Sequence, residues 1–381
     1  MRFNFGLGKE WAELKRFEEL SDEQRSIVFY AENKASINHF RLLISELTKE
    51  KNLQVCYVTS VKNDPIFSSK NRNICMFYIG DKTARTKFFI TLKAKILIMD
   101  MPDLNSYHIK RSKVYPVHYI YIFHSMFSTH SYLRKGALDN YDTIFCVGKH
   151  HEEEIRKTEM VYKLKPKKLI KYGYGRLDTL LRDKQKFQRI NGSNDEFVII
   201  APSYGKDNLL EVCGNELLEI LLKSNFRVLL RPHFRTLSES KKTIKKILNR
   251  FGNNPKFILE EGIISPEKFH KSKCMISDWS GISLEYAFTF ERPVILIDVP
   301  KKILNQNSKD ISLKPIEISI RDKIGHVVSP RNLEKIPGII RKIDGNSSVN
   351  EQIRKIRLKT VYNIGNSAQI GAKYIQDLID Q

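Results

Sequence analysis

Short apolar runs alternate with amphipathic segments along the first half of the chain. The run SIVFYAE (residues 26–32) is rich in strand-forming residues; the next segment, KASINHFRLLISELTKE, has apolar residues at helical spacing and leads into another apolar run, LQVCYVTS. A strand, a helix and a strand in this order predict two parallel strands joined by a right-handed crossover. Repetition of the pattern indicates a sheet that helices cover on both faces. Further strands are predicted at FFITL (88–92), AKILIMD (94–100), YIYIFHS (119–125) and DTIFCVG (142–148).

The pattern lapses in the polar, turn-rich segment RDKQKFQRINGSNDE (residues 182–196), which is typical of an interdomain linker. Apolar runs and amphipathic helices alternate again beyond it, which predicts a second doubly wound parallel sheet. The strands predicted there are FVIIAP (197–202), FRVLLRPH (226–233), KFILEE (256–261), KCMISD (273–278) and RPVILID (292–298).

We therefore predict an α/β protein with two Rossmann-like domains whose parallel sheets face an interdomain cleft. The N-terminal domain is predicted to span residues 1–187 and the C-terminal domain residues 196–345. Residues 346–381 are expected to form helices that pack back on the N-terminal domain. Ligands of open α/β sheets bind outside the carboxyl ends of the strands, so the chemistry is expected there.

Length and composition agree with this organisation. A chain of 381 residues is longer than one hydrophobic core supports, and its 41% hydrophobic content excludes wholesale disorder. No stretch is long and apolar enough to span a membrane, and the charges near the start do not fit a secretory signal. The five scattered cysteines fit a reducing compartment, so a cytoplasmic protein is expected.

Charge is the strongest compositional signal. Lysine and arginine number 65 against 43 acidic residues, which gives a formal net charge of +22. Such an excess suits nucleic acid, a membrane surface or an anionic substrate. The basic run KKTIKKILNR (residues 241–250) has its apolar residues on one helical face and no interleaved aromatic motif. We expect an ordinary surface helix there and no nucleic-acid partner.

A strand end in the second half carries groups suited to a phosphate. The segment SDWSGISLEYA (residues 277–287) follows a strand and opens a helix. Ser280 and Gly281 would lie at the first turn, where amide groups and the helix dipole favour an anion. An N-cap role for Asp278 or Ser280 explains the same pattern and stays open.

Two further motifs offer basic groups. In LLRPH, proline ends a strand between Arg231, whose guanidinium can bind a diphosphate, and His233, which can donate a hydrogen bond. A surface ion pair is the alternative for Arg231. In GYGRLD (residues 173–178), two glycines predict a loop that constrains Arg176, although an ordinary turn has the same composition.

Histidines give the candidate acid–base groups. His124 ends the strand YIYIF, where it can act as a general base, and His130 follows six positions later. A structural role for His124 stays open. His150 and His151 adjoin three glutamates on a predicted helix, and we expect both on a solvated face.

No acidic motif is convincing as a metal site. Asp100 and Asp103, in MDMPDLN, are explained by a turn or an N-cap. Arginine, lysine and helix termini are therefore expected to stabilise charge in place of a metal ion.

Five motifs, taken in order, resemble those of the CDP-glycerol glycerophosphotransferase family: HSMF, GYGRLD, IIAPSYG, LLRPH and ISDWSGISLEYAFTFERPVIL. Members of this family prime and polymerise teichoic acids and related capsule polymers. The resemblance covers about residues 124–298. It implies a GT-B fold and transfer of an alditol phosphate, such as glycerol phosphate, from a CDP-activated donor to an acceptor hydroxyl. CMP would be released, with no obligatory metal or other cofactor.

The resemblance also implies roles for particular residues. His124 matches the family's general base, with His130 as the next candidate. The implied acceptor is a lipid-linked or polymeric anionic glycan, and the basic surface would dock the enzyme peripherally on the anionic inner face of the plasma membrane. The implied donor-binding residues are Arg231, His233, Asp278, Ser280, Gly281, Arg176, Asp178 and Ser203.

Departures from the family pattern leave the transferred group open. Ser125 and Met126 stand where the family has glycine and threonine, and Tyr174 and Gly175 stand before Arg176 where the family has proline. A GT-B glycosyltransferase that uses a nucleotide-sugar donor in surface glycan synthesis is the alternative function.

Overall fold

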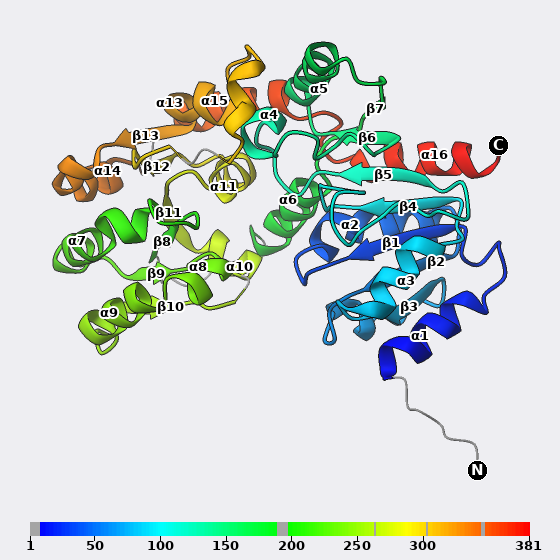
Figure 1. Ribbon diagram of the computed structural model, residues 1–381. Helices are drawn as coiled ribbons and strands as arrows, with labels where there is room; N and C mark the ends of the chain where they lie inside the picture. Colours follow the sequence, from blue (N-terminus) through cyan, green and yellow to red (C-terminus); the bar gives the residue numbers. More distant parts are fainter. Residues whose placement is uncertain (1–7, 189–196, 263, 302–303, 344–346) are drawn as a thin grey trace. The chain divides into compact units, whose positions relative to one another are not determined.

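The computed structural model describes residues 8–188, 197–262, 264–301, 304–343 and 347–381. The chain divides into two compact units, each built on a parallel sheet with helices on both faces (Figure 1). These sheets confirm the predicted α/β class. Unit 1 comprises Met1–Asp178, Asn305–Leu313 and Thr360–Gln381, and unit 2 comprises Thr179–Leu304 and Lys314–Lys359.

Unit 1 has a seven-stranded sheet in the order β3-β2-β1-β4-β5-β6-β7. The strand order reverses between β1 and β4, as it does in a Rossmann fold, and this reversal is a topological switch point. Every residue of β1, β2, β4 and β6 is buried, which explains why their sequences are continuously apolar. The strands are β1 Ile27–Ala31, β2 Val55–Thr59, β3 Ile74–Tyr78, β4 Ile96–Met99, β5 His118–Ile122, β6 Thr143–Cys146 and β7 Lys168–Lys171.

Helices cover this sheet and close its core. In α2 the apolar residues recur at helical spacing and are buried against β1, β2 and α16. On the other face, Phe17 of α1 makes edge contacts with Phe77 of β3 and Phe88 of α3. The helices are α1 Lys9–Glu18, α2 Ile37–Ser45, α3 Thr83–Thr91, α4 Thr129–Tyr132, α5 Lys149–Tyr162 and α16 Ser367–Ile379, with the π-helix η1 Glu46–Glu50 and the 3-10 helices η2 Pro65–Ser68 and η3 Gln306–Asp310. Helix α6, Gly175–Gln188, begins in unit 1 and continues in unit 2.

Unit 2 repeats the Rossmann order in six strands, β10-β9-β8-β11-β12-β13, with its switch point between β8 and β11. Helices α7 and α14 bury their apolar faces in a core with the inner strands. The strands are β8 Phe197–Ala201, β9 Val228–Leu230, β10 Phe257–Leu259, β11 Ser272–Ser277, β12 Val294–Ile297 and β13 Gly325–Val328. The helices are α7 Leu209–Lys223, α8 Phe234–Glu239, α9 Lys241–Phe251, α10 Pro266–His270, α11 Ile282–Phe290, α12 Ile316–Ser319, α13 Arg321–Ile324, η4 Pro330–Lys335, α14 Ile336–Ile343 and α15 Ser347–Thr360.

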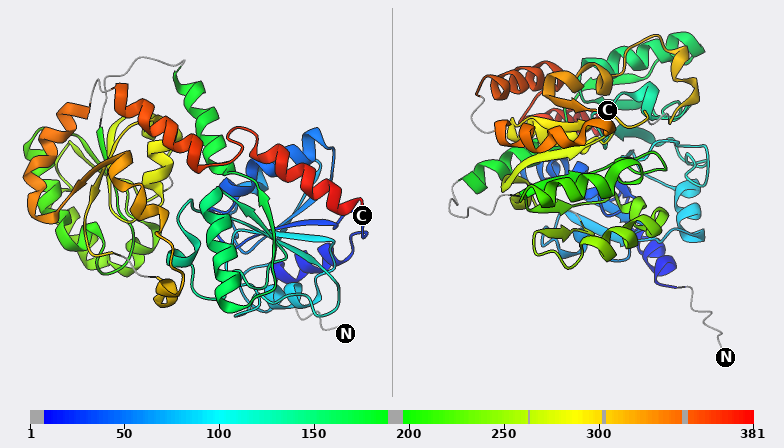
Figure 2. Two further views of the ribbon diagram at one scale, coloured as in Figure 1. Left: turned by 90° about the horizontal axis from the view of Figure 1, so that it is seen from above. Right: turned by 90° about the vertical axis from the view of Figure 1, so that its left-hand side faces the viewer.

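The end of the chain belongs to unit 1, where α16 packs against α2 (Figure 2). The segment that leads into α16 passes close to the backbone at two glycines. A Cβ on Gly148 would lie 1.8 Å from the carbonyl oxygen of Thr360, and one on Gly173, which has φ +103°, would lie 2.4 Å from that of Tyr362. Only glycine allows such close backbone contact, so these two positions define the path of the segment.

Two predictions about elements are corrected. FFITL (residues 88–92) is not a strand: α3 includes Phe88 and Phe89, both buried, and Leu92 caps its end. The predicted linker 182–196 is helical in α6 as far as residue 188, and residues 189–196 lie outside the described chain. In the described chain, no helix has the length and apolar character needed to cross a membrane.

Candidate functional site

Polar side chains gather at the switch point of unit 1. Ser36 and His39 follow β1, Asp100 follows β4 and His124 follows β5. The carboxyl ends of these parallel strands lie at one edge of the sheet, so residues that are far apart in sequence meet there. We call these four residues and Tyr174 the His124 cluster.

His124 is held by its backbone surroundings. Its Nδ1 lies 2.9 Å from the backbone carbonyl oxygen of Asp100, and the Tyr174 hydroxyl donates to the His124 carbonyl at 3.1 Å. A carbonyl oxygen only accepts, so Nδ1 carries the proton and Nε2 presents a lone pair in the neutral ring. In this tautomer Nε2 is the nitrogen that can accept a proton.

Asp100 is a buried carboxyl group, 4% exposed, and is more than the turn residue expected from its sequence. The Ser36 hydroxyl donates to its Oδ1 at 3.0 Å. Burial raises the pKa of Asp100 to about 7, because the charged form loses its hydration; the hydrogen bond from Ser36 lowers the pKa but does not offset this effect. The backbone carbonyl of Asp100 also orients His124, so the ends of β4 and β5 are linked by a hydrogen bond.

His39 of α2 adds a second imidazole, with its ring centroid 6.3 Å from that of His124 and 6.0 Å from that of Tyr174. Burial lowers its pKa well below the usual value, and the nearby charges of Arg176 and His124 act in the same direction. His39 is therefore neutral at physiological pH. Arg176, which is half-buried, lies close enough to contribute its field to this cluster.

His130, the alternative base, lies in a separate buried network of unit 1. Its Nε2 donates to the Leu313 carbonyl at 3.0 Å, and its Nδ1 lies 3.5 Å from Glu154 Oε1. The Asn305 side chain donates to the His130 carbonyl at 2.8 Å. These contacts hold the segment 305–313 against the rest of unit 1.

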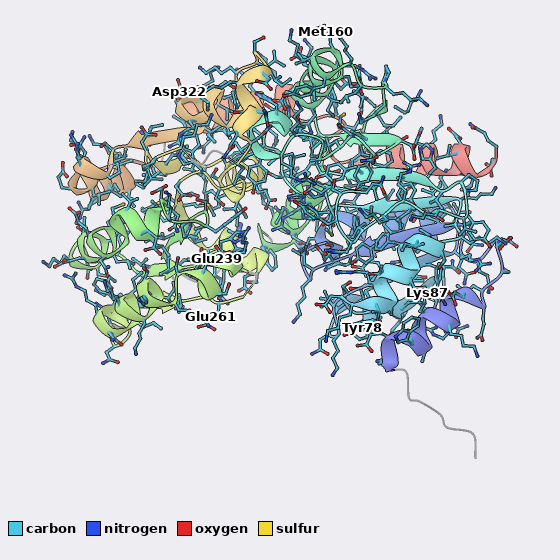
Figure 3. All side chains as sticks on the ribbon, in the orientation of Figure 1. Tyr78, Lys87, Met160, Glu239, Glu261 and Asp322 are labelled. Atoms are coloured by element: carbon cyan, nitrogen blue, oxygen red, sulfur yellow. The ribbon has the colours of Figure 1, made fainter. Side chains whose placement is uncertain are left out.

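The expectation that His150 and His151 form a solvated face is wrong. His151 is fully buried: its Nε2 donates to the Phe127 carbonyl at 2.9 Å, and its Nδ1 accepts from the Val147 amide at 3.3 Å. His150 lies 3.0 Å from the carbonyl of Met126. The solvated face of α5 carries residues such as Met160, which is 62% exposed and points outward in Figure 3.

Asp278 occupies the switch point of unit 2, immediately after β11. It is 2% exposed and accepts from the Ser203 amide at 2.7 Å, the Ser203 hydroxyl at 3.1 Å and the Leu209 amide at 2.9 Å. Burial raises its pKa, against the lowering effect of these donors. The carboxylate thus holds the loop after β8 and the first residue of α7, and it positions Ser203 through these bonds.

The RPH motif lies at the end of β9, next to β8 in the same sheet. The Arg231 amide continues the ladder by donating to the Ile200 carbonyl at 2.9 Å. His233 caps α8: its Nδ1 accepts from the Arg235 amide at 3.2 Å, which leaves the proton of the neutral ring on Nε2. Its ring lies 4.6 Å from that of Tyr204, so the loops after β8 and β9 meet.

Ser280 and Gly281 lie half-exposed at the start of α11, where Gly281 is the N-cap residue. The Ser280 carbonyl accepts from the Ser283 hydroxyl at 2.8 Å. Gly281 itself has no side chain with which to cap this first turn. Unit 2 therefore places Ser203, Arg231, His233 and Ser280 at the carboxyl ends of β8, β9 and β11, with Ser203 bonded to the buried Asp278.

The motif GYGRLD is only partly a loop, since α6 begins at Gly175 and its first turn contains Arg176 and Asp178. Asp178 is 1% exposed and accepts from the Gly365 amide at 2.7 Å and the Ser367 amide at 3.2 Å. Its carboxylate thus anchors the segment before α16, whereas Arg176 lies beside the His124 cluster.

Sequence reasoning missed Ser36 and His39 as members of the His124 cluster. Both follow the first predicted strand, so the rule that ligand groups lie at strand ends near the switch point would have found them. Among the residues that the structure describes, no group of three or more His, Cys, Asp or Glu side chains is placed to hold a metal ion.

Two Rossmann-ordered units with polar groups at both switch points define the GT-B type of fold, and solved structures support this class. The wall teichoic acid polymerase TagF matches 98% of this chain and 94% of its own, with 15% identity and a TM-score of 0.62; one TagF structure, soaked with CDPG, has a TM-score of 0.64. The UDP-GlcNAc 2-epimerase of Methanocaldococcus jannaschii matches 93% and 99%, with 12% identity and a TM-score of 0.57. A search of curated proteins finds no significant match.

A family model decides the assignment within this class. The model described as CDP-Glycerol:Poly(glycerophosphate) glycerophosphotransferase matches residues 14–303. The chain therefore belongs to this family of transferases, and the resemblance read from its motifs is confirmed.

Proposed function

We propose that the protein transfers an alditol phosphate, with glycerol phosphate as the first candidate, from a CDP-activated donor to a hydroxyl of an anionic glycan acceptor. Family membership supports the CDP-glycerol donor. The single observation that carries the chemistry is the bond from His124 Nδ1 to the Asp100 carbonyl, which presents Nε2 as a base at a switch point. The product polymer would be teichoic acid or a related capsule polymer.

In the proposed reaction, Nε2 of His124 takes the proton of the acceptor hydroxyl as its oxygen attacks the alditol-linked phosphorus. The bond from this phosphorus to the bridging oxygen breaks, and CMP leaves with the electron pair. His39, which its burial keeps neutral, adds no positive charge beside His124.

Unit 2 is proposed to hold the donor diphosphate. Arg231, His233 and the first turn of α11 offer a guanidinium, a ring N–H and helix amides to the phosphoryl oxygens. Such donors stabilise the charge on the leaving CMP, so we propose that the reaction needs no metal ion. We expect the enzyme to retain its activity in excess EDTA. If EDTA abolishes the activity and added Mg²⁺ restores it, the proposed metal independence is wrong.

The test of the base compares His124→Gln with His326→Gln, whose histidine is exposed on β13. Loss of a general base lowers kcat by ~10²–10⁴-fold. We expect this loss for His124→Gln, measured as CMP release from CDP-glycerol, while calorimetric donor affinity stays nearly constant. Full turnover would remove His124 from the mechanism. Saturable binding of UDP- or CMP-sugars but not of CDP-glycerol or CDP-ribitol would favour the glycosyltransferase.

Peripheral attachment to an anionic membrane is proposed from the net charge of +22. Each lysine or arginine near such a surface contributes roughly 1 kcal/mol. Co-sedimentation with phosphatidylglycerol vesicles should therefore be strong at low salt and absent with phosphatidylcholine vesicles. Equal binding to both, or to neither, would refute attachment by charge.

A further inference from the structure

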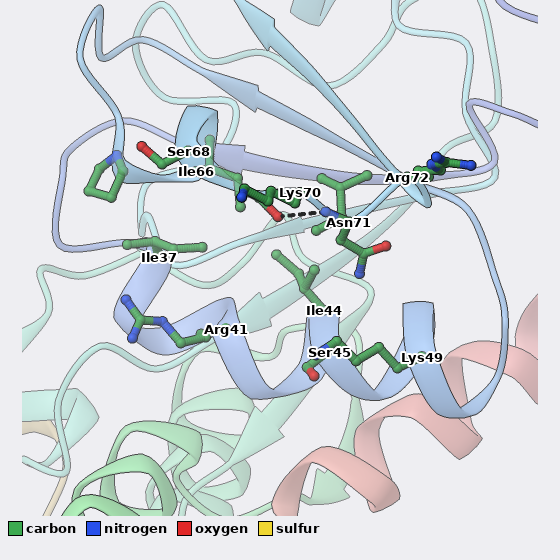
Figure 4. Close-up of a pocket in the computed structure, with 13 residues that line it drawn as sticks. Ile37, Arg41, Ile44, Ser45, Lys49, Ile66, Ser68, Lys70, Asn71 and Arg72 are labelled. Atoms are coloured by element: carbon green, nitrogen blue, oxygen red, sulfur yellow. Dashed lines mark hydrogen bonds between the residues drawn. The ribbon is translucent and has the colours of Figure 1, made fainter.

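A groove of about 780 Å³ lies in unit 1 between α2 and the segment that joins β2 to β3 (Figure 4). It lies outside the residues assigned to catalysis or donor binding above. Four basic side chains line it, Arg41 and Lys49 from the helical side and Lys70 and Arg72 from the opposite side, and none of its lining residues is acidic. We call it the α2 groove.

The four cations are exposed and uncompensated. Within the described ranges, none of them has an ion pair or a hydrogen bond to another residue. Some exposed lysines elsewhere do pair: Lys149, for example, lies 3.0 Å from Glu153. Four like charges around one concavity repel each other, and an anion that binds among them relieves this repulsion.

The floor of the groove is formed by apolar side chains that do not extend into solvent. Ile37, Ile44, Ile66 and Ile74 line it, and each is 3–8% exposed because its body belongs to the core of unit 1. A low-dielectric floor strengthens the field of the cations above it. A concave floor suits an extended chain better than a flat lipid bilayer, which needs protruding apolar side chains for insertion.

The spacing of the cations favours a ligand with several negative charges. Arg41 and Lys49 are eight residues apart on a continuous helical stretch, so about 12 Å of rise separates them. A ligand that contacts both at this separation is more easily a chain than a single phosphate. Ser45, Ser68 and Asn71 add neutral hydrogen-bonding groups between the charges. A chain with phosphates at intervals and short aliphatic links matches this arrangement.

We propose that the α2 groove binds a chain of phosphodiesters and holds the growing polymer of the reaction. Helix α2 connects the two sites, because His39 of the His124 cluster lies near its start and the groove extends along it. The role as an acceptor site rests on the proposed function, whereas polyanion binding rests on the groove alone.

The test compares the full-length protein with two variants of equal charge. The groove variant combines Arg41→Gln, Lys49→Gln, Lys70→Gln and Arg72→Gln. The control variant replaces four exposed lysines of α9 with glutamine, namely Lys241, Lys242, Lys245 and Lys246. The probes are a fluorescent oligomer of glycerol phosphate, polyglycerol of the same length without phosphate, inorganic phosphate, and phosphatidylglycerol vesicles.

We expect the groove variant to bind the oligomer roughly 100-fold more weakly at moderate salt, and the control variant less than about 3-fold more weakly. Polyglycerol and inorganic phosphate should bind weakly to all three proteins. Equal losses in both variants would reduce the effect to net charge, and an unchanged oligomer affinity would overturn the proposal. If only vesicle binding is lost, the groove recognises a lipid surface instead.

CMP release with glycerol as a small acceptor separates this inference from the proposed function. If the unmodified protein releases CMP normally with glycerol but does not bind the oligomer, the proposed role of the α2 groove is refuted and the proposed function is not. Groove-dependent oligomer binding without turnover would refute the function and leave the groove standing. As a second variant, Ser68→Glu places a negative charge at an exposed position of the lining and should weaken oligomer binding without affecting the fold.

Discussion

Replacement of Asp278 by alanine should destabilise unit 2 and weaken donor binding together. The buried carboxylate accepts two backbone amides, of Ser203 and Leu209, at 2.7 and 2.9 Å. Alanine leaves both donors buried without this acceptor, and the loop after β8 loses its attachment to β11. The Ser203 hydroxyl can rotate toward another partner, so the amides dominate the cost.

The magnitude follows from these two amides. Each buried donor left unsatisfied costs about 1–3 kcal/mol, which gives about 4 kcal/mol for the pair. Burial of the charge, which raises the pKa of Asp278, offsets part of this, so we expect a net loss of about 3 kcal/mol. Asp278→Asn keeps one carbonyl acceptor but turns an NH₂ group toward an amide donor, so its loss should be smaller, about 2 kcal/mol.

Urea unfolding measures this loss, because each unit contains one of the two tryptophans. In a Trp11→Phe background, emission from Trp279 reports unit 2. With a slope of about 3 kcal/mol per molar urea, the transition should move by about 1 M. Asp64→Ala is the matched control, since Asp64 is a buried carboxylate of unit 1 that accepts from the Ile66 amide and the Thr59 hydroxyl.

Three results are decisive. If Asp278→Ala leaves the Trp279 transition in place but abolishes donor binding, Asp278 is a direct ligand and the positioning role is wrong. If neither stability nor binding changes, the three hydrogen bonds to Asp278 do not contribute measurably to the stability of unit 2 or to donor binding. If Asp64→Ala moves the Trp279 transition as far as Asp278→Ala does, the effect is not specific to unit 2.

Further predictions concern unit 1 and the proposed donor-binding residue Arg231 of unit 2. The pKa of Asp100 is raised to about 7, so between about pH 4 and 7 the native state binds more protons than the unfolded state and stability falls as pH rises. The melting temperature should therefore decrease over this pH range, and Asp100→Asn, which keeps an acceptor for Ser36, should make the decrease smaller. Asp178→Ala removes the acceptor of the segment before α16 and should speed amide hydrogen exchange in α16, whereas unchanged exchange would refute the anchor. Gly173→Ala should lower the melting temperature, because its Cβ would lie 2.4 Å from a carbonyl oxygen and φ is positive; an unchanged value would contradict the close contact. Arg231→Ala should weaken donor binding about 10-fold or more in calorimetry, and unchanged affinity would exclude Arg231 as a phosphate ligand.

The inner strands were predictable, and most of the edge strands were not. Central parallel strands are buried on both faces, so their sequences are continuously apolar. The missed strands β3, β7 and β13 are all edges. All three are partly exposed. β7 and β13 contain lysine or glycine, so no continuous apolar run marks them, whereas β3, with the sequence ICMFY, is an apolar run that was not among the predicted strands.

The run FFITL shows the limit of a short apolar pattern. Five residues fit a strand or one face of a helix equally well. The structure selects a helix because Phe88 and Phe89 pack in aromatic contacts with Phe17 and Tyr30 from other elements. Such a choice depends on partners far away in the sequence, which periodicity does not report.

The sequence by itself determined the α/β class, the two parallel sheets, the family and the strand-end positions of the candidate groups, because periodicity and motif order are local properties of the chain. Tertiary structure decided what those groups do. It places Asp178 in an anchor for the chain end, buries Asp278 and His151 in hydrogen bonds, and joins His39 to His124. It also brings the basic residues of α2 and of the β2–β3 connection around one groove. Burial, proton position and charge compensation depend on neighbours that only the folded chain supplies.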